Sequence, residues 1–182
     1  TDTHYAGNYL PEGAELTYKW PGWGQNKEIH DVNYSEGIFT GYRWYDAKNI
    51  EPLFPFGHGL SYTTFKIGKP KLSSSKMKKD GKIAVKVDVT NTGKVAGAEV
   101  AQLYIAAPKT DVERPVRELK NFGKVFLQPG ETKTVEMQIK WRDLAYWHTA
   151  KSHWHVIPGT YQIEVGTSSR EIRSQATLDY TL

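Results

Sequence analysis

The sequence contains no cysteine among its 182 residues. Disulfide bonds and thiolate chemistry are therefore excluded, although the absence does not fix a cellular compartment. No run of 18 apolar residues occurs, so we expect no membrane-spanning helix. The first residues, Thr1 to Tyr5, have neither the basic nor the apolar region of a secretory signal. If the protein is exported, its signal lies elsewhere.

A strong charge of one sign is also missing, because 24 basic and 20 acidic residues leave a formal net charge of +4. The excess is local: seven lysines and a single acid, Asp80, lie between Lys66 and Lys82. Nucleic-acid binding needs a basic face with arginine or aromatic contacts, and this stretch has neither residue type. We interpret it as a solvated strand and loop, and we expect no nucleic-acid partner.

Aliphatic side chains are scarce in the first third of the chain. Residues 1–62 carry 13 aromatic residues but only eight valine, isoleucine, leucine or methionine residues. A segment of about 60 residues buries too little surface to form a core alone, yet this one is too aromatic for a disordered tail. We infer that it packs against protein outside this sequence. Its clearest strand-like stretch is Gly37 to Asp46.

Residues 63–182 show a regular strand pattern with no convincing helix. Between Lys82 and Val89, apolar residues alternate with polar ones, as in a strand with one buried face. Further strands are predicted at 65–72, 98–105, 118–127, 132–139, 161–165 and 176–180, and residues 145–147 and 154–156 flank a polar tip. Roughly seven or eight short strands at this spacing predict a fibronectin III-like or Ig-like β-sandwich. Each sheet should have one buried and one wet face.

Seven short motifs follow one another in a characteristic order: Tyr34–Asp46, Glu51–Thr63, Val89–Gly93, Gly97–Tyr104, Arg114–Lys120, Leu127–Glu131 and Pro158–Ser169. In this order they resemble the C-terminal region of glycoside hydrolase family 3, β-glucosidase-like enzymes. The first motif, with Glu36-Gly37 followed by Gly41-Tyr42-Arg43, is similar to a stretch of the family's second domain region. The second motif is similar to the segment that joins the family's second and third domains. The resemblance covers about Tyr34 to Arg173.

The resemblance implies a retaining β-glycosidase of three domains. A barrel domain would carry an aspartate nucleophile, an α/β sandwich domain a glutamate acid/base, and the third domain would be fibronectin III-like. Neither catalytic carboxylate has a counterpart in this chain, so we name no catalytic residue and expect the chain alone to be inactive. The double-displacement reaction needs two carboxyl groups and no metal or organic cofactor.

The fold expected is therefore mainly β. Residues 1–62 would be the tail of the second, α/β sandwich domain with the interdomain linker, an irregular aromatic-rich segment. Residues 63–182 would be the fibronectin type III-like domain.

Trp20 and Trp23 flank a Pro-Gly turn, and indole rings suit the flat apolar faces of sugars. We weigh a place at the rim of a substrate site against packing between domains, which we favour. Arg43 and Asp46 lie near the expected domain junction, where a structural ion pair or hydrogen bond is the default interpretation.

His153 and His155 share one face of a predicted strand, and His148 comes shortly before them. This spacing can bind zinc, but a third and fourth ligand are not evident, so we predict no metal site. The residues between the histidines suggest an exposed hairpin tip. For Trp154 we expect core packing.

Two functions remain in view. In the first, the chain is the C-terminal portion of a β-glycosidase, with β-glucosidase preferred over β-xylosidase, acting on oligosaccharides or glycosides. Its partner would be the N-terminal part of the same enzyme, a homodimer is left open, and a periplasmic or extracellular location is preferred over a cytoplasmic one. In the second, it is a free-standing sandwich that binds carbohydrate or protein. A free-standing module has no use for a long aromatic extension.

Overall fold

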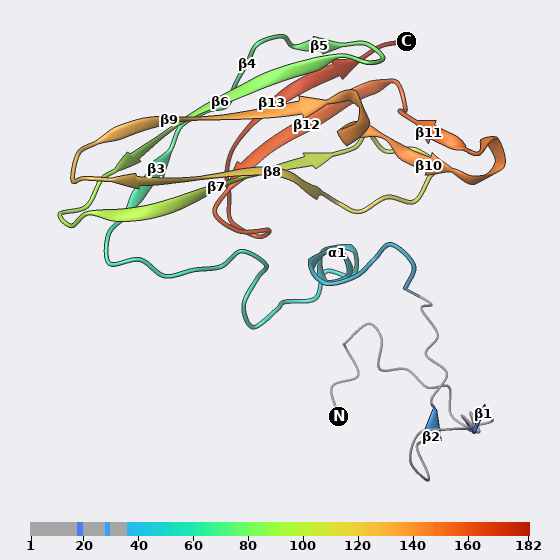
Figure 1. Ribbon diagram of the computed structural model, residues 1–182, viewed down its shortest axis with the longest axis horizontal. Coiled ribbons are helices and arrows are strands. Elements are labelled where there is room, and N and C mark those ends of the chain that lie inside the picture. The colour runs from blue at the N-terminus through green and yellow to red at the C-terminus, as the bar shows by residue number, and fades with distance from the viewer. Residues whose placement is uncertain (1–17, 20–27, 30–35) are drawn as a thin grey trace.

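The computed structural model describes residues 18–19, 28–29 and 36–182. The chain is mainly β, with one α-helix among the described residues, as Figure 1 shows. In chain order the elements are β1 (Tyr18–Lys19), β2 (Glu28–Ile29), α1 (Tyr42–Ala47), β3 (Phe65–Ile67), β4 (Lys71–Leu72), β5 (Lys76–Met77), β6 (Lys82–Asn91), β7 (Gly97–Ala106), β8 (Glu118–Leu127), β9 (Thr132–Lys140), the 3₁₀ turn η1 (Trp141–Leu144), β10 (Tyr146–His148), η2 (Thr149–Lys151), β11 (His153–His155), β12 (Gly159–Gly166) and β13 (Ile172–Tyr180).

Two sheets face each other and confirm the predicted sandwich. One sheet has the order β5-β13-β12-β7-β8, and in the other β6 pairs with β3, β4 and β9. All pairs are antiparallel except β5 with β13. The long edge strands β8 and β9 come close to each other, and the Asn121 side chain donates a hydrogen bond to the Gln138 carbonyl oxygen at 3.1 Å. The predicted strand near 65–72 is divided into β3 and β4.

The core lies between the sheets and is built by the period-2 pattern of the sequence. Along β6, Ile83, Val85, Val87 and Val89 are buried and the residues between them are not. They meet side chains of β7 and β12, including Leu103 and Ile163, in one apolar cluster. Burying each such aliphatic side chain contributes on the order of 1.5–3 kcal/mol, so this cluster is the main source of the sandwich's stability.

The outer face of the β7–β12 sheet departs from the prediction of one wet face per sheet. Gln102 and Tyr104 of β7 and Glu164 of β12 point away from the core, yet all three are buried. The segment that contains α1 covers them, and it runs along this side of the sandwich in Figure 1. Part of the aromatic front segment therefore packs on this chain's own sandwich.

The prediction of a strand at Gly37 to Asp46 is wrong. A turn at Glu36–Phe39 is followed by helix α1, which begins after Gly41 at a φ of 57°. Tyr42 and Asp46 are four residues apart, a spacing that places them on the same face of a helix. The aromatic composition favoured a strand, but contacts with the sheet below decided the local structure. Among the described residues, no helix is long and apolar enough to cross a membrane.

Gly166 ends β12 at a bulge, just before the turn that leads into β13. A Cβ atom at this position would overlap the backbone carbonyl oxygen of Glu171. Because backbone atoms of the sheet cannot move aside cheaply, Gly166→Ala should lower the free energy of unfolding by about 1–3 kcal/mol. Urea unfolding measures the change. Gly59→Ala is the control, since nothing lies within 4 Å of its Cβ position, and equal losses in both variants would contradict the prediction.

Candidate functional site

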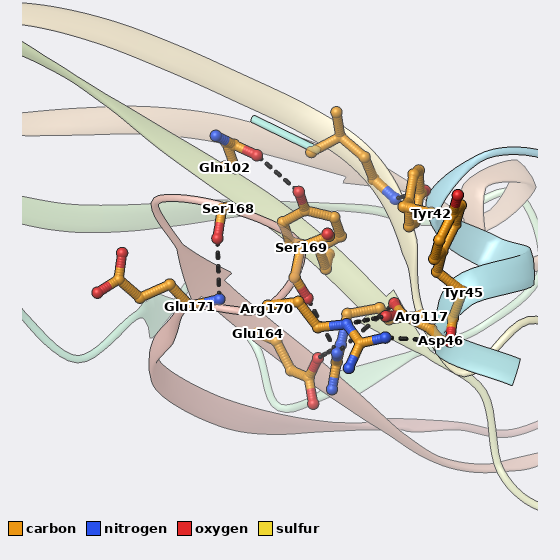
Figure 2. A network of polar contacts seen from close by, with 12 residues as sticks. Tyr42, Tyr45, Asp46, Gln102, Arg117, Glu164, Ser168, Ser169, Arg170 and Glu171 are labelled. Carbon is orange, nitrogen blue, oxygen red and sulfur yellow. Dashed lines mark hydrogen bonds and ion pairs between the residues drawn. The ribbon is translucent and has the colours of Figure 1, made fainter. Parts of the chain in front are cut away.

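Helix α1 is attached to the sandwich by four charged side chains, which we call the helix junction: Asp46, Arg117, Glu164 and Arg170. Asp46 comes from α1, and its side chain is only 4% exposed. Its carboxylate lies 2.6 Å from Nε of Arg170 and 3.8 Å from Nη1 of Arg117. Figure 2 shows these side chains converging beneath the helix.

Arg170 also binds the backbone on both sides of the end of the helix. Its Nη2 donates hydrogen bonds to the carbonyl oxygens of Tyr45 at 3.0 Å and Ile50 at 2.8 Å. The Tyr45 carbonyl oxygen also accepts from the Ile50 amide at 2.9 Å, so Arg170 gives it a second hydrogen bond just where the chain leaves α1. One guanidinium therefore fixes the helix and the turn that follows it.

Arg117 links the junction to the sheet. Its Nε donates to Glu164 at 2.7 Å and its Nη1 to the carbonyl oxygen of Ser169 at 3.0 Å. Burial raises the pKa of Asp46, although Arg170 and Arg117 oppose that change. The ionised form of Asp46 thus depends on its two arginine partners, and losing either would leave a costly buried charge.

The β12–β13 turn binds the other end of the covering segment. The amide of Ser169 donates to the Phe56 carbonyl oxygen at 2.9 Å. Gln102 Nε2 donates to the carbonyl oxygens of Thr167 at 2.6 Å and Gly57 at 3.3 Å, and accepts at Oε1 from the Tyr104 hydroxyl at 2.6 Å. These buried bonds hold residues 56–57 against the outer face of β7.

A second charged group lies at the start of β8. Glu118 is within 3.5 Å of Arg43 and 3.4 Å of Lys120, and accepts a hydrogen bond from Arg114 at 2.9 Å. Burial alone would raise the pKa of Glu118, but Lys120, Arg114 and Arg43 together outweigh it and lower the pKa. The amide of Leu119, next in the chain, donates to the Tyr42 hydroxyl at 2.9 Å. Arg43 and Tyr42 thus attach α1 to β8.

The carboxylates Asp46, Glu118 and Glu164 are each paired with arginine. Glycoside hydrolysis needs one carboxyl that donates a proton and another that is free to attack. Carboxylates committed to arginine in this way position the backbone instead. The site is therefore an attachment point between segments.

Several apolar side chains of the covering segment remain exposed. We call Ile38, Leu53, Phe54, Leu60 and Tyr62 the docking strip. Phe54 is 70% exposed, Leu60 95% and Tyr62 100%. The backbone around them is held at Ile50, at Phe56 and at Thr63, whose hydroxyl donates to Asn91 at 2.7 Å. Leu53, Phe54, Leu60 and Tyr62 therefore lie between fixed points of the backbone, and Ile38 precedes them.

Comparison with known proteins identifies the relatives of this arrangement. Residues 99–169 match a family model described as a fibronectin type III-like domain. The chain is 48% identical over 147 residues to beta-glucosidase BoGH3A of Bacteroides ovatus, which covers 81% of this chain and 20% of that protein. It is 50% identical over 141 residues to thermostable beta-glucosidase B of Acetivibrio thermocellus, covering 78% and 19%.

Solved structures that resemble this chain are beta-glucosidases as well. The beta-glucosidase of Kluyveromyces marxianus in complex with glucose matches with a TM-score of 0.78 and 45% identity, over 83% of this chain and 18% of that one. Beta-glucosidase 3B of Thermotoga neapolitana matches with a TM-score of 0.75 and 42% identity, over 81% and 20%. The chain belongs to glycoside hydrolase family 3. It is a C-terminal part with the fibronectin type III-like domain, and it spans about a fifth of the length of these relatives.

The family 3 motifs found in the sequence meet at the helix junction. Asp46 belongs to the first motif, Arg117 to the fifth, and Glu164 with Ser169 to the seventh. The expected structural ion pairs of Arg43 and Asp46 are confirmed, with partners that the sequence did not reveal. Arg170 was missed, because a lone arginine after a strand carries no signal of its own.

Other residues proposed from the sequence have different outcomes. Trp20 and Trp23 lie outside the described residues. The histidines of β10 and β11 come together, but among the described residues no group of three His, Cys, Asp or Glu side chains is placed to hold a metal ion. The predicted core position of Trp154 is wrong. This indole is 37% exposed, because it lies on a hairpin that extends beyond the core.

Arg170 is the residue whose loss should release α1 from the family 3 chain. Arg170→Lys keeps the charge but cannot reach a carboxylate and two carbonyl oxygens at once. We expect the free energy of unfolding to fall by about 3 kcal/mol, with faster hydrogen exchange at the amides of residues 44–50. Arg173→Lys is the control, since Arg173 makes an exposed pair with Glu171. Unchanged exchange in Arg170→Lys would contradict this role.

Glu118 should make stability depend on pH in acid. Its folded pKa lies below its ordinary value of 4.5, so the unfolded state binds more protons as the pH falls. The stabilisation is complete above about pH 5 and is lost as the pH drops from 4.5 through the folded pKa. Glu118→Gln should therefore flatten this part of the stability profile, measured by urea unfolding from pH 7 to 3. Glu136→Gln, at an exposed position, should leave the pH dependence of stability unchanged. An unchanged profile in Glu118→Gln as well would show that the ion pairs of Glu118 do not stabilise the fold.

Proposed function

We propose that this chain is the non-catalytic C-terminal portion of a retaining β-glucosidase that hydrolyses terminal β-D-glucosidic bonds in oligosaccharides or glycosides. The 48% and 50% identity to proteins named beta-glucosidases supports this activity for the whole enzyme. The reacting carboxylates would be supplied by the N-terminal part of the same enzyme. The chain's own role would be to fix the position of its front segment against that part.

The docking strip is the observation that carries the proposal. Its apolar side chains are exposed on a backbone held by Arg170, by the Ser169 amide and by Thr63. A flexible linker can expose apolar side chains without a defined surface, but a fixed backbone presents them in one arrangement. Large apolar side chains left exposed on an ordered backbone are candidates for an interaction site. The N-terminal part of the enzyme is the partner that fits.

A free-standing module that binds carbohydrate or protein is the second candidate. It would need its exposed surface on the sandwich or on loops that extend from it. The polar network that holds residues 42–57 would then have no evident use, because those residues add no rigid binding cleft of their own. We therefore prefer the docking role.

Reconstitution tests the proposal. The chain alone should not hydrolyse p-nitrophenyl β-D-glucopyranoside, and neither should the N-terminal polypeptide alone. Mixing the two should restore turnover and give a complex of one copy each by light scattering. Turnover by the isolated chain would show that it has its own catalytic carboxylates. Full activity of the N-terminal polypeptide alone would refute a structural role for this chain.

Charge placed in the docking strip should prevent the reconstitution. In Leu60→Asp a carboxylate would have to enter an apolar interface unpaired, so we expect at least a tenfold loss of restored activity. Leu182→Asp is the matched control, because Leu182 is equally apolar and exposed but lies at the C-terminus. Equal activity in the two variants would rule out the strip as the interface. A stable homodimer of the isolated chain, lost in Leu60→Asp, would assign the strip to a second copy instead.

A further inference from the structure

Strands β10 and β11, with η2 between them, form an aromatic hairpin that extends beyond the end of the sandwich in Figure 1. Its register pairs Trp147 with Trp154 on one face. The other face carries only Tyr146, His148, His153 and His155, with neighbouring rings 5.7–6.5 Å apart. Each of the six strand side chains is therefore a flat ring, and none is aliphatic.

The two indoles are accessible although the hairpin is ordered. Trp147 is 48% exposed and Trp154 37%, and their rings meet edge to face at 5.5 Å. The guanidinium of Arg142 lies 3.3 Å from the centre of the Trp154 ring and covers one of its faces. Trp147 is thus the more accessible ring, and its orientation is set by Trp154.

A cleft of about 770 Å³ lies beside the hairpin. Trp147 and Tyr146 line it together with polar side chains, among them Glu113, Asp143 and His148. A volume of this order suits a small ligand rather than a protein surface. An aromatic wall with polar groups at its edge can take a ligand that has one apolar face and hydroxyl groups around its rim.

Four basic and three acidic side chains line the cleft, so their charges nearly balance. Arg43, Arg114 and Lys120 all surround Glu118, and Asp143 accepts a hydrogen bond from the Lys140 amide at 2.7 Å. A charged ligand would have to displace these internal pairs, whereas a neutral one would not. The cleft therefore favours an uncharged ligand that is rich in hydroxyl groups.

We propose that the aromatic hairpin and its cleft bind a neutral oligosaccharide, with Trp147 stacked on the apolar face of one sugar ring. The choice of β-linked glucose units rests on the proposed function, whereas the site itself rests on the geometry of the hairpin. Glu113, Asp143 and His148 line the same cleft and are the candidates for hydrogen bonds to the sugar hydroxyls. The site adds ligand binding to a chain otherwise assigned a structural role.

Calorimetric titration of the 182-residue chain with cellopentaose tests the site. Trp147→Ala should weaken binding about tenfold, because the stacking surface is removed. Trp147→Phe keeps a flat ring and should retain most of the affinity. Phe126→Ala removes an equally exposed ring from the far end of β8 and should bind as the parent chain does. Circular dichroism confirms folding of each variant.

The results that overturn the proposal are specific. Absence of heat and of chemical-shift changes on adding cellopentaose to the folded chain would eliminate the site. Equal losses in Trp147→Ala and Phe126→Ala would show general adhesion of sugar to exposed rings. Preference for carboxymethylated over neutral glucan would contradict the argument from charge, and concentration-dependent dimerisation lost in Trp147→Ala would assign the hairpin to a second copy. Because these measurements involve no hydrolysis, their failure leaves the proposed function of the enzyme unaffected.

Discussion

The contact between Asp46 and Arg170 is the interaction on which the front of this molecule depends. Helix α1 has six residues, and isolated helices shorter than about 12–15 residues are only marginally stable in water. Its sequence supplies no side-chain cap, and none of its residues is fully buried. Its position comes instead from one guanidinium that binds a buried carboxylate and two carbonyl oxygens. Placement of residues 42–57 is thus mainly a matter of polar chemistry, unlike the apolar core of the sandwich.

The contrast between an apolar sandwich core and a helix held by polar contacts explains what could be predicted from the sequence. The strands β6 and β9 follow from alternation of apolar and polar residues, because a half-buried strand repeats every two residues. The helix could not be found in the same way. Its residues are aromatic and follow glycine, which reads locally as a strand, and the partners that hold it lie 70 to 125 residues away, as the contact from Arg170 to Tyr45 shows.

The candidate site was predictable only in part. Motif order identified the family, and position suggested ion pairs for Arg43 and Asp46, but the pattern could not say that Arg117, Glu164 and Arg170 would complete them. Trp154 shows the opposite error. The resemblance to family 3, which has an aromatic residue before its Pro-Gly turn, suggested a core residue. Instead its partner across the hairpin is another tryptophan, and its ring is covered by Arg142. Pairing across strands, which a single sequence does not display, decides between core and surface here.

The arrangement of the sheet borders has a consequence for the chain as a separate polypeptide. An unpaired strand at a border offers free amide and carbonyl groups to other chains and so promotes aggregation. Here β3, β4 and β5 are only two or three residues long, and the two long border strands, β8 and β9, are turned toward each other, with Asn121 bonded across the gap. Few backbone amide and carbonyl groups are therefore left to pair with strands of another chain. The sandwich is protected from fibril-like association even when no partner covers the docking strip.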